Sequence, residues 1–132
     1  MRVNALDHVN IIAKNLDATA SFYEVVLGLE RRNGPPPLSP ENAQWMFDIS
    51  GRAIVHINTH DAPKAVERVT NGLHTGAVHH VALNCSGHDE MRERLRAFGI
   101  DCVCNEISAI GLRQIFVSDP NDVLLELNFF AE

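Results

Sequence analysis

The sequence has no run of lysine or arginine and no long hydrophobic stretch. Its 132 residues include 11 basic and 17 acidic side chains, which give a formal net charge of −6. An acidic chain without a basic stripe argues against nucleic acid or an anionic membrane as the main partner. The apolar runs are far shorter than the roughly 20 residues that a membrane-spanning helix needs. The first residues, MRVNALDHVN, lack the hydrophobic core of a signal peptide, so we expect a cytoplasmic protein.

Cysteine is also scarce. The three cysteines, Cys85, Cys102 and Cys104, are odd in number and do not form the pattern of a disulfide framework. Free thiols are typical of a reducing compartment. A C-x-C pair can bind a soft metal ion, but we predict instead that the two thiols share one face of a strand and are buried.

Histidine, in contrast, is abundant. Histidine is the commonest metal ligand in proteins and the usual proton carrier near neutral pH. The seven residues are His8, His56, His60, His74, His79, His80 and His88. Because a single histidine says little, their positions in the chain have to decide which ones matter.

An internal repeat organises these positions. Residues 4–12 and 77–85 both alternate as strands do, and each is followed by a helical pattern that ends at Gly28 or Gly99. Asn15 or Asp17 can cap the first helix, and Ser86 lies near the start of the second. Further strand patterns occupy residues 44–50, 52–58, 101–107, 113–119 and 122–130. Each half therefore reads β-α-β-β-β.

We predict an α+β fold of two tandem βαβββ modules in a single domain that spans residues 1–132. Module one covers about residues 1–60 and module two about residues 77–132, joined by a linker over about residues 61–76 that holds a short helix near 62–69. The proline-rich residues 33–43 predict a loop. Modules of this size are too small to bury a good core alone, so they must pack on each other or on a second chain.

Each module also places one potential metal ligand near its start and one near its end. His8 and His56 are 48 residues apart, and His80 and Glu126 are 46 apart. Glu126 stands in the apolar sequence LLEL, where a carboxylate is costly to bury unless it is paired or bound to a metal. If these strands line one concave sheet, three imidazoles and one carboxylate converge as a donor set for a divalent first-row metal. The alternative is that these four residues have separate structural roles. Their repetition at equivalent positions of the two modules argues against this alternative.

The motifs LDHVNI, SFYEVVLGLE, HHVAL and VSDPNDVLLEL resemble the vicinal oxygen chelate superfamily. That superfamily includes glyoxalase I, fosfomycin- and bleomycin-resistance proteins, methylmalonyl-CoA epimerase and extradiol dioxygenases. The resemblance implies a cupped mixed sheet around one divalent ion: Zn, Mn, Ni, Co or Fe. It implies metal ligands at His8, His80 and Glu126, with His56 at the position of a fourth ligand. The strand register matches His80, not His79, to His8.

The resemblance further implies an enzyme of lyase or isomerase type. Its substrate is a small molecule with a carbonyl or vicinal oxygens, and the metal stabilises the negative charge that develops during proton transfer or addition. Glu126 and His56 are the expected catalytic residues. Asn10, Arg113 and Phe116 are expected to contact the substrate. Relatives of this length imply a homodimer with sites shared between chains.

Two other functions remain open at this stage. An Fe(II) extradiol-type dioxygenase uses two histidines and a carboxylate, with an acid–base histidine at His56, but it carries a tyrosine where this chain has Phe116. A fosfomycin- or bleomycin-type resistance protein, or a non-enzymatic ligand-binding protein, is the other possibility. Residues 45–47 fit either a pocket or a core. Asp122 replaces a glycine that is usual in the last turn, which predicts a local adjustment of that turn.

Overall fold

The computed structural model describes residues 1, 4, 6, 8–63 and 80–130. The chain divides into two compact units, Met1–Val69 and Thr70–Glu132, and each is described by itself. The division falls in the stretch that we predicted to join the modules. Most of the short helix predicted near residues 62–69 lies outside the described residues, as do His74 and His79.

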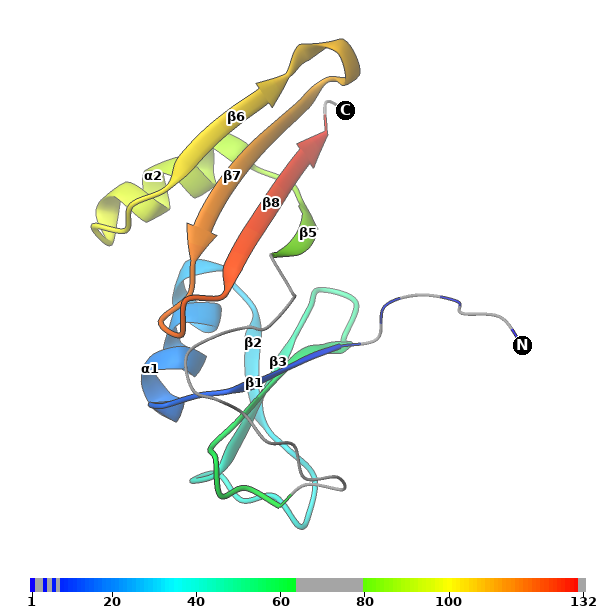
Figure 1. The fold of residues 1–132 in the computed structure, drawn as a ribbon, viewed down its shortest axis with the longest axis vertical. Helices are drawn as coiled ribbons and strands as arrows, with labels where there is room; N and C mark the ends of the chain where they lie inside the picture. The colour runs from blue at the N-terminus through cyan, green and yellow to red at the C-terminus, as the bar shows by residue number, and fades with distance from the viewer. Residues whose placement is uncertain (2–3, 5, 7, 64–79, 131–132) are drawn as a thin grey trace. The chain divides into compact units, whose positions relative to one another are not determined.

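The first unit holds one sheet and one helical segment (Figure 1). Its elements are β1 (Val9–Ile12), α1 (Leu16–Ser21), the π-helical continuation η1 (Phe22–Val26), β2 (Glu30–Asn33), β3 (Ala43–Phe47) and β4 (Ala53–Asn58). The strand order is β1-β4-β3-β2. β1 runs parallel to β4, and the other neighbours are antiparallel.

The second unit repeats this plan. Its elements are β5 (Val81–Cys85), α2 (His88–Ala97), β6 (Val103–Ile107), the short 3-10 helix η2 (Ser108–Ile110), β7 (Leu112–Ser118) and β8 (Leu124–Phe130). The strand order is β5-β8-β7-β6, again with the first and last strands parallel. The predicted α+β fold of two tandem βαβββ modules is therefore confirmed. Among the described residues, no helix combines the length and the apolar composition that crossing a membrane requires.

The helices begin and end for local reasons. Asn15, not Asp17, is the N-cap of α1, and its side chain accepts the N–H of Ala18 at 2.9 Å. Tyr23 and Val26 in the continuing helical segment are buried, as their spacing predicts. Gly28 follows with φ +74°, a backbone conformation that glycine adopts without strain.

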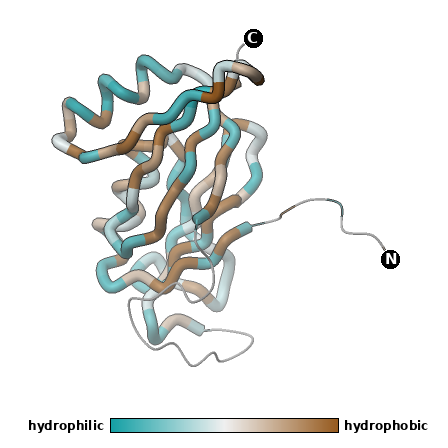
Figure 2. The backbone as a smooth tube through the Cα atoms, turned by 45° about the horizontal axis from the view of Figure 1, so that its top comes forward, coloured by the Kyte–Doolittle hydropathy of each residue, from teal (hydrophilic) through white to brown (hydrophobic). Residues whose placement is uncertain are grey.

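Each sheet has one face toward its own helix and one face away from it, which we call the open face. In the second unit, buried apolar side chains from β7 and β8 form the helix-side face: Ile115, Val117, Leu125, Leu127 and Phe129. The residues between them point to the open face. Figure 2 shows the resulting alternation of hydrophobic and hydrophilic residues along the strands.

Two expectations from the sequence need correction. The sequence pattern did not locate β2, because its residues ERRN form an edge strand with no apolar alternation. The prediction that Cys102 and Cys104 are a buried pair is wrong, because both are exposed. β6 is also an edge strand, and all of its residues are exposed.

The last two strands of both units are joined by the same turn. Asp48 Oδ1 accepts the backbone N–H groups of Ser50 at 2.9 Å and Arg52 at 3.0 Å. Asp119 Oδ1 accepts those of Asn121 at 2.7 Å and Val123 at 2.9 Å, at the same offsets along the chain. The hydrogen bonds from Ser50 and Arg52 lower the pKa of Asp48 to about 2. A carboxylate therefore organises each turn.

The third residue after each of these aspartates has a positive φ. It is Gly51, at +80°, in the first unit and Asp122, at +61°, in the second. The turn that contains Asp122 keeps its hydrogen bonds, so replacing the usual glycine leaves the turn in place. The cost is local strain, because a side chain disfavours this region.

We therefore expect Asp122→Gly to raise the free energy of unfolding by about 0.5–1 kcal/mol, since glycine removes the left-handed strain. The matched change in the other unit, Gly51→Asp, should lower it by a similar amount. Urea denaturation monitored by circular dichroism measures both. A loss of stability in Asp122→Gly would contradict the strain argument.

Candidate active site

In the first unit, parallel pairing of β1 and β4 brings His8 to His56. Asn10 lies directly opposite His56 in the register. His8 precedes Asn10 by two residues, so it is on the same open face. The two imidazole rings stack, with centroids 3.9 Å apart and planes 14° from parallel.

The other face of the His56 ring is covered by Trp45. Trp45 lies opposite His56 on β3, and their rings stack at 3.8 Å with planes only 5° apart. The indole edge in turn lies against Gly34, where an added Cβ would be 3.2 Å from Trp45 Nε1. The His56 ring is therefore held between the rings of His8 and Trp45.

The aromatic surface continues along the same face. Arg32 lies opposite Trp45 on β2, and its guanidinium carbon is 4.4 Å from the centre of the Phe47 ring. Glu30 accepts two hydrogen bonds from this guanidinium at 2.8 Å. Met46 points the other way and is fully buried. Of residues 45–47, the first and third line the open face and the second belongs to the core.

In the second unit, His80 meets Glu126. Ala82 lies opposite Glu126 in the parallel pair of β5 and β8, so His80 shares the face of Glu126. His80 Nε2 lies 3.3 Å from Glu126 Oε2. The Glu126 side chain is only 15% exposed, whereas His80 is 38% exposed. This pair occupies the same place in its unit as His8 and His56 do in theirs.

A network of side-chain amides fixes the Glu126 carboxylate. Gln114 Nε2 and Asn128 Nδ2 each donate to Glu126 Oε1 at 2.9 Å. Gln114 also donates to Asn128 Oδ1 at 2.9 Å and accepts from Asn105 Nδ2 at 2.8 Å. Two donors thus hold Oε1, and Oε2 is left facing His80.

Our reading of the sequence missed this network. The signal was present as polar residues at two-residue spacing in apolar strands: Gln114 before Phe116, and Asn128 after Glu126. Gln114 is 7% exposed, and buried amides of this kind are normally hydrogen-bonded.

The three expected substrate contacts divide between the two faces of their sheets. Asn10 is exposed beside His56, and Phe116 lies opposite Glu126, so both are on open faces. Arg113 is on the helix side of β7 instead, where its Nη1 lies 3.1 Å from Asp89 Oδ1 on α2. A hydrogen bond with His88 and the charge of Arg113 lower the pKa of Asp89. Arg113 is thus held on the opposite face of the sheet from Glu126.

The side chains within each unit set a limit on metal binding. In the described part of either unit, no three His, Cys, Asp or Glu side chains gather as a ready metal cluster. An ion bound by imidazole lies near the ring plane, at about 2.0–2.1 Å from the nitrogen. The nearly parallel rings of His8 and His56 have centroids 3.9 Å apart, so no single ion lies in both planes. In this arrangement, only one of these two histidines can bind a given ion. Imidazole nitrogens and the oriented Glu126 oxygen are nonetheless donors that suit divalent first-row metals.

Comparison with known proteins identifies the family. Residues 7–116 match the profile of the Glyoxalase/Bleomycin resistance protein/Dioxygenase superfamily. The chain therefore belongs to this superfamily.

Individual relatives agree. Glyoxylase I 4 from Arabidopsis thaliana is 25% identical over 130 residues, which cover 96% of this chain and 71% of that protein. A glyoxalase/dioxygenase from Nostoc punctiforme has a similar fold, with a TM-score of 0.74 and 14% identity over 97% of this chain and 92% of that one. A point mutant of the fosfomycin resistance protein FosX from Listeria monocytogenes, solved with Mn(II) and 1S,2S-dihydroxypropylphosphonic acid, has a TM-score of 0.67 and 19% identity. That match covers 98% of this chain and 95% of the FosX chain.

The amide network predicts the effect of removing Gln114. We expect Gln114→Leu to lower the free energy of unfolding by about 1–3 kcal/mol, because Glu126, Asn128 and Asn105 each lose a partner. Arg113→Leu, one residue away but in a solvent-exposed ion pair, should change it by less than about 1 kcal/mol. Denaturant titration of both variants measures the difference. Equal effects would show that the network contributes nothing beyond strand packing.

Proposed function

We propose that the protein is a divalent-metal-dependent enzyme of glyoxalase type, with a lyase or isomerase reaction on a small carbonyl or vicinal-oxygen substrate. One observation carries this proposal. In each unit, a histidine next to the first strand contacts a potential ligand or proton carrier on the last strand, and both lie on the open face. The pairs are His8 with His56 and His80 with Glu126. Membership in a superfamily that includes glyoxalase-type enzymes supports it, and so does a structural relative solved with Mn(II).

The proposed metal ligands are His8, His80 and Glu126. When bound, the ion supplies a Lewis acid that stabilises negative charge developing on substrate oxygen. His56 was the fourth expected ligand. Its stacking against His8 supports a different role for it, as a proton carrier beside the metal.

The protein side chains handle the proton. Glu126 is held by two amide donors to Oε1, which leaves Oε2 oriented to accept a proton. The flat stack fixes the orientation of the His56 ring, and we assign this ring the role of proton carrier. Asn10 can bond a polar group of the substrate beside His56, and Phe116 supplies an apolar wall beside Glu126. Arg113 has no part in this proposal because of its pairing with Asp89 on the helix side.

Assembly and location complete the proposal. We propose a homodimer with sites shared between its chains, a small-molecule substrate and no nucleic-acid partner. The cytoplasm is the proposed location, because Cys85, Cys102 and Cys104 are free thiols and such thiols are typical of a reducing compartment.

A second function is favoured by the same stacking. If His56 does not bind the ion, two histidines and one carboxylate remain, which is the ligand set of non-haem Fe(II) oxygenases. His56 would then act as the acid–base group of an extradiol-type dioxygenase. Phe116 weakens this alternative, because that position lacks the hydroxyl that dioxygenases carry.

The first test is elemental analysis of the protein purified without chelator. We expect about one divalent ion per chain, and a loss of at least about 10-fold in metal affinity in His8→Ala, His80→Ala and Glu126→Gln, because each removes a donor. His60→Ala is the matched control, since this exposed histidine of the first unit is outside the proposed set.

The element found separates the two enzyme classes. Zinc, nickel, cobalt or manganese supports the lyase or isomerase reaction, whereas iron with oxygen-dependent turnover of catechols supports the dioxygenase. Absence of metal after reconstitution with each cation would overturn both and leave a ligand-binding protein. Metal retained in all three variants would overturn the proposed ligand set.

The second test uses Trp45, the single tryptophan of the chain, as a reporter of His56. The stacked imidazole of His56 is part of the surroundings of the indole. We therefore expect the intensity or the wavelength of Trp45 emission to change in His56→Ala, which removes the stacked ring, and to stay unchanged in His60→Ala. Unchanged emission in His56→Ala would contradict the stack.

A further inference from the structure

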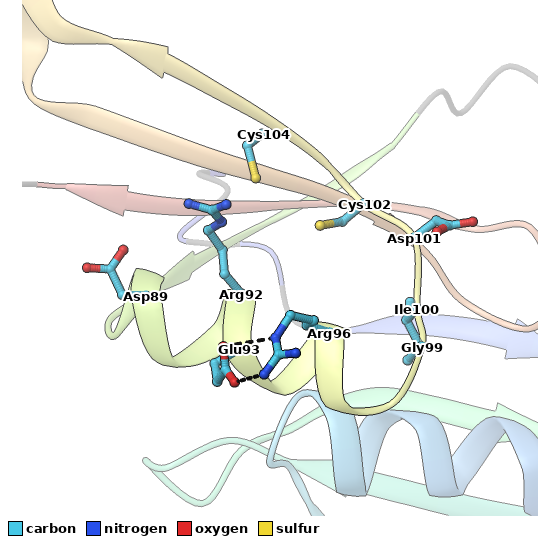
Figure 3. A pocket seen from close by; sticks show the side chains of 9 residues that line it. All are labelled: Asp89, Arg92, Glu93, Arg96, Gly99, Ile100, Asp101, Cys102 and Cys104. Atoms are coloured by element: carbon cyan, nitrogen blue, oxygen red, sulfur yellow. Dashed lines mark hydrogen bonds and ion pairs between the residues drawn. The ribbon is translucent and has the colours of Figure 1, made fainter.

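The second unit has a groove on the helix side of its sheet, away from the open face. Its volume is about 720 Å³, and it is lined by the exposed side of α2 and by residues 99–102 and 104. Figure 3 shows Cys102 and Cys104 in this groove, with the Arg92 side chain extending from α2 toward them. Cys104 lies opposite Ile115 in the register, whereas Glu126 lies opposite Phe116, so the groove and Glu126 are on opposite faces of one sheet.

The two thiols are close in sequence and lie on one side of the chain. They belong to an extended segment, in which residues two apart project to the same side. An extended chain rises about 3.3 Å per residue, so their Cα atoms are about 6.6 Å apart. Both cysteines are free and exposed. The two sulfurs can therefore bind one atom placed between them.

Arg92 is the cation of the groove that acts on the thiols. Glu93 forms an ion pair with Arg96, and Asp89 forms one with Arg113. Within the described residues, Arg92 takes part in no such pair. Its charge lowers the pKa of Cys102, whereas the charge of the nearby Asp101 raises it. The guanidinium is therefore available to balance negative charge that develops on the sulfurs.

The environment of Cys102 argues against redox exchange. Partial desolvation in the groove raises the pKa of its thiol, and the neighbouring Cys104 raises this pKa further. A protonated thiol is a poor nucleophile toward disulfides. A metal ion with high affinity for sulfur can still displace the protons and bind.

We propose that Cys102 and Cys104 form a two-sulfur site for a soft monovalent metal ion, copper(I), with Arg92 as its counter-charge. Two thiols release two protons to solvent, two S–Cu bonds form, and no electron is transferred. The resulting complex carries one negative charge, which the Arg92 guanidinium neutralises. Soft thiolates select Cu(I), whereas structural zinc requires four closed ligands. Among the described residues, no third His, Cys, Asp or Glu side chain gathers with the two thiols as a metal cluster.

The test is an anaerobic competition for Cu(I) between the protein and the chromophoric chelator bicinchoninate. We expect the wild type to withdraw one Cu(I) per chain and to release two protons per ion. Cys102→Ser and Cys104→Ser should each weaken binding by at least about 100-fold, because one sulfur alone cannot chelate. Arg92→Leu should weaken it by about 5–10-fold, while Arg92→Lys retains most of the affinity.

Cys85→Ser is the matched control, because Cys85 on β5 is also a free thiol but does not line the groove. The competition is repeated in the His80→Ala variant, where Cu(I) binding at the cysteines should be unchanged. Binding that survives Cys102→Ser, or that is lost in Cys85→Ser, would overturn the proposal. The proposal would also be overturned if the protein bound zinc in preference to Cu(I) and lost the zinc in Cys102→Ser and Cys104→Ser.

Discussion

Parallel pairing of the first and last strands of each unit is the constraint on which the candidate site depends. Parallel neighbours cannot be joined by a tight turn, so a long connection must lie between them. In each unit this connection consists of a helical segment and two further strands. The pairing then sets residues 48 or 46 positions apart next to each other, His8 with His56 and His80 with Glu126. A slip of one residue in either pair would turn these side chains to the helix side.

The two units use this common frame in chemically different ways. In the first unit, His56 is oriented by flat stacking of its ring between His8 and Trp45. A carboxylate needs donors, so Glu126 is oriented by the amides of Gln114 and Asn128. The equivalent positions of the repeat therefore carry an aromatic support in one unit and a hydrogen-bonded support in the other.

Much of this arrangement could be predicted from the sequence, and the failures share a cause. Alternation and the repeat revealed the central strands, because these are half-buried and their periodicity is strong. The edge strands carry no such signal. The sequence pattern did not locate β2, and it wrongly predicted that Cys102, just before β6, and Cys104, within β6, are buried. The Gln114 network and the Trp45 stack depend on cross-strand register, which the sequence alone leaves open. The ion pair between Arg113 and Asp89 could not be predicted either, because it depends on how α2 packs against β7.

The same parallel pairing has a consequence for folding. The contact between His8 and His56 closes nearly a whole module, and such distant contacts form only after the intervening chain has been ordered. A chain emerging from the ribosome contains His8 long before it contains β4, and it cannot form the stacked pair until that strand has docked. The same holds for His80 and β8, whose last residue is Phe130. Each pair can thus form only in a module whose sheet is complete, and the pair of the first module can form before the second module has been synthesised.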